Sequence, residues 1–148
     1  MGKRLRVLVV EDEALLAMDI GAMIEDAGHE VVGEGASLDE VAAMSSDLSP
    51  DMAFVDIQLA EGSSGLDVCR LIRNRWRSTF IVFVTANAKM VPDDYAGAHG
   101  LIPKPFSRCG MTSALQYIVQ GLSDPPPRLA KPSSFSASPK LARSWACP

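Results

Sequence analysis

The stretch Leu5-Arg-Val-Leu-Val-Val-Glu-Asp-Glu13 joins a nearly continuous apolar run to three consecutive acids. Two further apolar runs, at residues 52–56 and 80–85, also end in a polar side chain, Asp56 and Thr85. Strands that are apolar along their whole length are typical of parallel sheets covered on both faces. These three runs therefore predict the centre of a buried parallel sheet.

Two shorter runs, at residues 30–35 and 101–103, complete five predicted strands. Helix-like apolar stripes separate them, and the sequence Ser37-Leu-Asp-Glu40 is a capping box that opens one of these helices. Alternating strands and helices predict an α/β fold with right-handed crossovers. The size favours a flavodoxin-like doubly wound sheet of order 2-1-3-4-5 with five helices. Pro92, Gly97 and Gly100 predict that helix four is short or irregular.

The composition changes near Gly121. Residues 121–148 hold six of the ten prolines and carry four basic residues against one acid, so residues 1–120 have a net charge of −7 within the total of −4. We expect one domain over residues 1–120 and a disordered Pro/Ser-rich tail over residues 121–148. Leu129, Phe135, Leu141 and Trp145 are scattered through this tail, and a short docking motif is the alternative interpretation.

Several protein classes are disfavoured by these patterns. The acidic charge of residues 1–120 makes nucleic acid an improbable partner. The apolar N-terminal run stops at Glu11, too early for a signal peptide or a membrane span. Three widely spaced cysteines show no metal-ligand pattern and suit a reducing compartment. We expect a cytoplasmic protein with no membrane partner.

Polar side chains stand where four predicted strands end. Glu11, Asp12 and Glu13 follow the first strand, and Asp56, Thr85 and Lys104 lie at the ends of three others. Sites in open parallel sheets form beyond the carboxyl ends of the strands. Clustered carboxylates resist ionising together unless a cation neutralises them, and all-oxygen ligands suit Mg²⁺. Carboxylate, metal, ammonium and hydroxyl together form a phosphoryl-transfer site with the carboxylate as nucleophile.

The motifs Val-Val-Glu11-Asp12-Glu13, Val-Asp56-Ile-Gln-Leu, Phe-Val-Thr85-Ala and Pro-Lys104-Pro105-Phe106 resemble the four signatures of bacterial response-regulator receiver domains, the superfamily of CheY. The resemblance covers residues 5–120. It implies that Asp56 is the phosphoacceptor and that Thr85 and Lys104 contact the phosphoryl group. It also implies a Mg²⁺ site formed by Glu11, Asp12, Asp56 and the carbonyl of Gln58, and a cis Lys104–Pro105 peptide.

The resemblance also implies the function. A single-domain regulator of this kind accepts a phosphoryl group from a sensor histidine kinase or a phosphotransfer protein. It catalyses its own phosphoryl transfer and slow autodephosphorylation, without being an enzyme in the ordinary sense. Its output is contact with an unknown downstream protein or onward phosphotransfer.

A narrower resemblance, carried by residues 16–20, 56–67 and 101–106, is to the receiver half of PhyR-type regulators of the general stress response. Those proteins carry a sigma-like domain before the receiver, for which this chain has no room. We therefore expect a related kinase or pathway rather than anti-sigma binding. One departure is Leu101, where receivers usually have Phe or Tyr as the rotor of their switch. We expect the signal to travel instead through residues 87–100.

Three other functions are compatible with parts of the sequence. A flavin-binding flavodoxin would share the fold, but the acidic first loop would repel the flavin phosphate. A phosphatase of the haloacid-dehalogenase type needs a second acid where Gln58 stands. A receiver-shaped interaction module that never uses phosphate is the more serious alternative.

Overall fold

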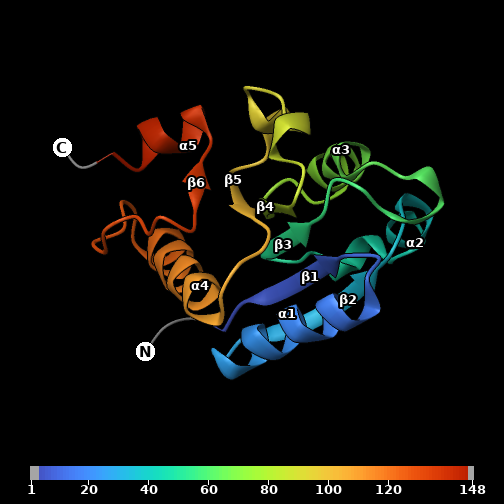
Figure 1. The fold of residues 1–148 in the computed structure, drawn as a ribbon, viewed down its shortest axis with the longest axis horizontal. Coiled ribbons are helices and arrows are strands. Elements are labelled where there is room, and N and C mark those ends of the chain that lie inside the picture. The colour runs from blue at the N-terminus through green and yellow to red at the C-terminus, as the bar shows by residue number, and fades with distance from the viewer. Residues whose placement is uncertain (1–3, 147–148) are drawn as a thin grey trace.

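The computed structural model describes residues 4–146, and Figure 1 shows its chain path. Six strands form one sheet in the order β2-β1-β3-β4-β5-β6. The strands are β1 Arg6–Val10, β2 Glu30–Gly35, β3 Met52–Val55, β4 Phe80–Thr85, β5 Gly100–Pro103 and β6 Ser136–Ala137. The first five pair in parallel, in the predicted order 2-1-3-4-5, and β6 pairs antiparallel with β5. The predicted flavodoxin-like α/β fold is thereby confirmed.

Two apolar layers cover the sheet. The helices are α1 Ala14–Asp26, α2 Leu38–Ala42, α3 Gly65–Arg75, α4 Arg108–Ser123 and α5 Pro139–Ser144. Side chains of α1 and α4 pack on one face, and those of α2 and α3 pack on the other (Figure 1). The four residues of β3 are all buried, as a strand covered on both faces requires. None of the helices in residues 4–146 is long and apolar enough to cross a membrane.

The helix caps follow the sequence signals. The Ser37 hydroxyl accepts from the backbone N–H of Glu40, and the Glu40 carboxylate accepts from the backbone N–H of Ala36. This capping box opens α2 as predicted, but α2 ends at Ala42 and a short 3-10 turn, η1 Ser46–Leu48, fills the rest of the predicted helix.

The chain between β4 and β5 contains two single 3-10 turns, η3 Ala88–Met90 and η4 Tyr95–Gly97. A third, η2 Ala60–Gly62, precedes α3.

The C-terminal segment differs from the disordered tail expected over residues 121–148. Helix α4 continues to Ser123, and the following residues return to the sheet as β6 and α5 (Figure 1). Phe135 is fully buried, and its ring lies so near Gly100 that a Cβ there would be 2.3 Å from it. The Trp145 ring similarly lies against Gly121 and stacks on Phe80. Two aromatic rings on two glycines thus anchor a segment whose composition alone predicts disorder.

Candidate phosphoryl-transfer site

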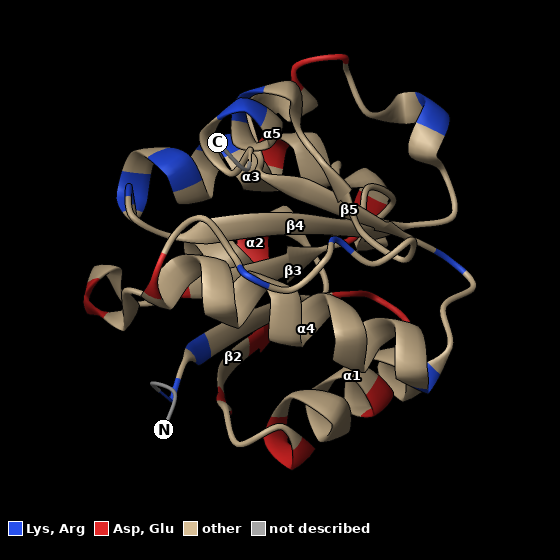
Figure 2. Ribbon diagram, turned by 90° about the vertical axis from the view of Figure 1, so that its left-hand side faces the viewer, with Lys and Arg blue, Asp and Glu red and all other residues tan. Residues whose placement is uncertain are grey.

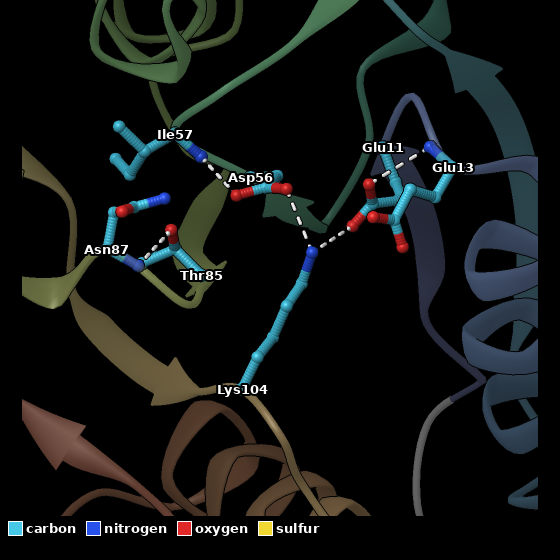
Figure 3. Close-up of polar contacts among 7 residues, drawn as sticks. All are labelled: Glu11, Glu13, Asp56, Ile57, Thr85, Asn87 and Lys104. Carbon is cyan, nitrogen blue, oxygen red and sulfur yellow. Dashed lines mark hydrogen bonds and ion pairs between the residues drawn. The ribbon is translucent and has the colours of Figure 1, made fainter.

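The carboxyl ends of the central strands bring the predicted acids and the lysine together. Glu11 and Asp12 follow β1, Asp56 follows β3, and Lys104 follows β5. Figure 3 shows the Lys104 side chain extending between Asp56 and Glu11. One ligand oxygen from each of Glu11, Asp12 and Asp56 lies within 4.8 Å of the others. Residues separated by up to 93 positions therefore form one site.

Lys104 bridges two buried carboxylates. Its Nζ lies 2.7 Å from Glu11 Oε1 and 2.8 Å from Asp56 Oδ2. The Glu11 side chain is 2% exposed and that of Asp56 is 9% exposed, so water screens these pairs weakly. The ammonium group therefore serves as the counter-charge of the site.

Backbone amides orient the remaining carboxylate oxygens. The Ile57 N–H donates to Asp56 Oδ1 at 2.7 Å, and the Glu13 N–H donates to Glu11 Oε2 at 3.1 Å (Figure 3). Hydrogen bonds from charged or backbone donors hold a carboxylate in its ionised, acceptor-only form. Each of the two buried acids is thus fixed at both oxygens.

The pKa values of two of these groups reflect the balance between burial and the ion pairs of the site. The pKa of Glu11 is raised, chiefly because burial disfavours its charged form; its bonds to Lys104 and Glu13 oppose this, and the charge of Asp56 adds to it. Burial alone would lower the pKa of Lys104, but its hydrogen bonds to Asp56 and Glu11 outweigh burial and raise it. Lys104 is therefore a permanent cation at neutral pH.

The donor set fits a hard divalent cation. Three carboxylates face one ammonium group, which leaves two negative charges for a metal ion to neutralise. Oxygen ligands of this kind, with the rest of the shell supplied by water, are those that Mg²⁺ prefers. Asp12 is exposed while Glu11 and Asp56 are buried, so Asp12 is the acid most open to a hydrated ion.

Thr85 lies at the end of β4, next to this cluster (Figure 3). Within the described residues, the buried Thr85 hydroxyl accepts from the Asn87 N–H at 3.0 Å, rather than bonding to Asp56 or Lys104 (Figure 3). The Gln58 side-chain amide lies 3.9 Å from Met90 Sδ. The Lys104–Pro105 peptide is cis, as expected.

Two residues with a part in the site were not identified from the sequence. The Asn87 N–H fixes the Thr85 hydroxyl, and nothing in the identity of residue 87 predicts a backbone donor. The N–H of Gly65 donates to Ile57 O at 2.7 Å, and a Cβ there would stand 2.0 Å from Asp56 O. The signal available for Gly65 was its place directly after the Ser64 cap of α3.

The chain matches the response regulator receiver domain over residues 7–116. It is 34% identical over 114 residues to the phyllosphere-induced regulator PhyR of Methylorubrum extorquens, covering 74% of this chain and 41% of PhyR. It is 32% identical over 121 residues to the chemotaxis protein CheY of Thermotoga maritima, covering 80% of this chain and 98% of CheY. The chain thus spans less than half the length of PhyR.

Solved structures agree with these matches. The response regulator PhyR of Brucella abortus superposes with a TM-score of 0.62 at 36% identity, over 75% of this chain and 45% of PhyR. A LuxR-family response regulator from Aurantimonas, 22% identical, superposes with a TM-score of 0.69 over 97% of this chain and 96% of its own, and shows the fold alone. The family match confirms what the four motifs predict: the chain belongs to the response regulator receiver domain family.

Proposed function

We propose that the chain accepts a phosphoryl group on Asp56 in a Mg²⁺-dependent reaction. The observation that carries this proposal is the Asp56 carboxylate at the open edge of the sheet, held by Ile57 and paired with Lys104 at 2.8 Å. One carboxylate oxygen of Asp56 attacks phosphorus, the bond to the donor's leaving group breaks and the leaving group departs, and an aspartyl phosphate forms. Receiver domains are not classical enzymes, and here the protein acts on itself.

The residues around Asp56 have separate parts in this reaction. The ammonium group of Lys104 neutralises charge on the phosphoryl oxygens, and the Thr85 hydroxyl, which accepts from Asn87 and keeps its own proton, donates to one of them. The metal would be held by Asp12, Asp56 and the Gln58 carbonyl, and by Glu11 mainly through water. When bound, Mg²⁺ supplies further neutralisation of the phosphoryl oxygens.

The partners follow from the chemistry. A high-energy phosphoryl group on histidine, carried by a sensor kinase or a phosphotransfer protein, is the donor, and the phosphorylated face contacts a downstream protein or passes the group onward. Water slowly hydrolyses the aspartyl phosphate at the same site. Each of these steps suits a cytoplasmic protein.

Incubation with acetyl phosphate and Mg²⁺, followed by intact mass spectrometry, tests the proposal. We expect one base-labile phosphoryl group in the native chain and none in Asp56→Asn, because an amide cannot attack. Asp51→Asn is the matched control, since Asp51 lies at the opposite end of β3 and bonds to the Arg6 N–H. Equal labelling of Asp56→Asn would exclude Asp56 as the acceptor.

Mg²⁺ titration tests the metal ligands independently of phosphorylation. Asp12→Ala should weaken Mg²⁺ binding more than Glu11→Ala, because a direct ligand contributes more than one acting through water. Chemical-shift changes in NMR spectra measure both affinities. If neither substitution changes the affinity, the ion binds elsewhere. A native chain that never takes a phosphoryl group would favour the alternative, a phosphate-independent interaction module.

A further inference from the structure

A second feature lies away from the phosphoryl-transfer site, between α3 and α5. A trough of about 1380 Å³ runs between these helices and the η4 turn. Its walls carry five cations: Arg70, Arg73, Arg77, Lys140 and Arg143. Asp93 and Asp94 lie on the η4 side, so the trough is net positive although the chain carries a net charge of −4. Lys and Arg segments gather at α3 and α5 in Figure 2.

Most of these cations have no structural partner. Within residues 4–146, Arg77, Lys140 and Arg143 make no hydrogen bond or ion pair, and all three are exposed. Arg75, the neighbouring cation on α3, is different: it donates to carbonyls at the end of α2 and lies over the Trp76 ring. Arg77, Lys140 and Arg143 are thus available to a ligand, whereas Arg75 is committed to the fold and Arg70 is paired with Asp67 at 2.6 Å.

Cations from both walls of the trough lie near one side chain, His99. His99 lines the trough, and its pKa is lowered first by burial and then by the positive charges of Lys140 on α5 and Arg73 on α3. Arg73 is also held in place, because its Nη1 donates to Ala96 O at 3.3 Å and its guanidinium lies against Gly97. Cations that are 67 positions apart in the chain therefore act on the same small region.

The shape and the charge together select the ligand. The trough is larger than a typical small-molecule pocket of about 300–1,000 Å³, and its cations are spread along it. It lacks the exposed aromatic platforms that single-stranded nucleic acids stack on, since the His99 ring is stacked on Phe80. A long polyanion would also meet the acidic remainder of the domain. A short run of carboxylates avoids both problems and matches the forked donors of arginine.

We propose that this trough binds a short acidic peptide segment of a partner protein. The site depends on the C-terminal segment, because α5 supplies Lys140 and Arg143. It is separate from Asp56 and does not require phosphorylation. Recognition is mainly by charge, so binding weakens as the salt concentration rises.

A fluorescein-labelled oligoglutamate peptide, followed by fluorescence anisotropy with the full chain, tests the proposal. We expect binding at low salt that falls as salt is added. The double variant Lys140→Glu/Arg143→Glu and the single variant Arg77→Glu, one for each wall, should each weaken it by about tenfold or more. Arg128→Glu is the matched control, because Arg128 is 83% exposed and does not line the trough. The control variant should bind as the native chain does.

Several results would overturn the proposal. One is that the native chain fails to bind the peptide, and another is that Arg128→Glu weakens binding as much as the trough variants do. The proposal also fails if substitutions in only one of the two walls weaken binding. A single-stranded oligoribonucleotide of similar length that binds as tightly would assign the trough to nucleic acid instead. Unchanged melting temperatures and unchanged labelling of Asp56 in the trough variants establish that each variant is folded. Failure of labelling in the native chain would reject the phosphoacceptor function while leaving the peptide result intact.

Discussion

Lys104 is the residue that supplies the positive charge opposite the buried carboxylates of the site. It stands between two buried carboxylates, so its removal leaves Glu11 and Asp56 facing each other without a counter-charge. In chelator, Lys104→Met should lower the free energy of unfolding by about 2 kcal/mol, because an uncompensated buried charge costs more than the pair contributes. Urea unfolding measures this loss.

Added Mg²⁺ distinguishes this explanation from a packing defect. The metal should restore more stability to Lys104→Met than it adds to the native chain, since the variant site is more negative. Lys89→Met is the control, because Lys89 is an exposed lysine in the β4–β5 connection and has no ion pair among the described residues. Native-like stability of Lys104→Met in chelator would show that the carboxylates do not need the cation.

The two histidines have a structural part that their sequence positions do not reveal. His29 Nδ1 accepts from the Leu5 N–H, and His99 Nδ1 accepts from the Ile81 N–H, each at 3.0 Å. A protonated ring cannot accept these bonds, and burial lowers the pKa of both side chains. The folded protein therefore keeps both rings neutral.

This arrangement makes stability depend on pH. Because the folded pKa of His99 lies below its unfolded value, the unfolded chain binds more protons, and stability falls as pH drops through about 6.5. We expect His99→Asn, whose amide oxygen can accept from Ile81 without titrating, to flatten this fall, even if its overall stability is lower. Urea unfolding at a series of pH values gives both slopes. Equal slopes in the variant and the native chain would mean that His99 is not the titrating group.

The residue-scale predictions from sequence succeeded where chain topology alone decides proximity. Glu11, Asp12, Asp56 and Lys104 follow buried strands, so a parallel sheet brings them to one edge. The Thr85–Asn87 bond and the histidine acceptors could not be predicted, because they depend on the direction of a lone pair and on contacts formed only after packing. Those contacts leave no periodic pattern in the sequence.

At the scale of elements, the connection from β4 to β5 is the least regular part of the domain. Its second turn, η4, is tied to α3, since Ala96 O accepts from both Cys69 and Arg73. Its first turn, η3, has local backbone bonds from Met90 to Asn87 and from Val91 to Ala88, and one long contact from Gln58 Nε2 to Met90 Sδ at 3.9 Å. The short or irregular helix four predicted from Pro92 and the two glycines corresponds to these turns.

We expect η3 rather than η4 to respond to phosphorylation. Thr85 donates to a phosphoryl group by moving toward it, and its bond to Asn87 passes that movement to η3, which follows directly, whereas η4 is held by α3. Beryllofluoride, which mimics the phosphoryl group, should therefore raise amide protection over residues 86–92 and leave residues 95–99 unchanged. Hydrogen exchange measures both segments. Repacking of Leu101 with no change over residues 86–92 would instead favour a conventional switch that uses leucine as its rotor.

The C-terminal elements show where element prediction from composition is weakest. Proline and serine dominate residues 124–139, and averaging over them hides the few large apolar side chains. Phe135 and Trp145 each lie against a specific glycine, and Leu141 is buried in the same apolar cluster. The fold of the remaining chain is predictable because its longer elements carry clear patterns, a continuous apolar run in β4 and an apolar stripe in α1.

At the scale of the whole molecule, the sheet has two outer strands with different protection. Strand β2 carries Glu30 and Glu34, and its pairing with β1 is interrupted between Val7 and Leu8. Charge and irregularity of this kind discourage a further strand from pairing. Strand β5 has neither, and its outer edge is covered by β6, which pairs at Gly100 and Leu101.

The two-residue strand β6 therefore protects the protein against edge-to-edge aggregation. A chain truncated after Ser123 would expose the β5 backbone together with the Phe80 and Tyr117 rings that Trp145 and Phe135 cover. We expect this shorter chain to self-associate as its concentration rises, while the full chain stays monodisperse under the same conditions. Light scattering across a concentration series compares the two chains. A truncated chain that stays equally monodisperse would show that β6 does not protect the β5 edge. A boundary drawn from the receiver match over residues 7–116 alone would remove this cover, so we expect a chain cut there to self-associate as well.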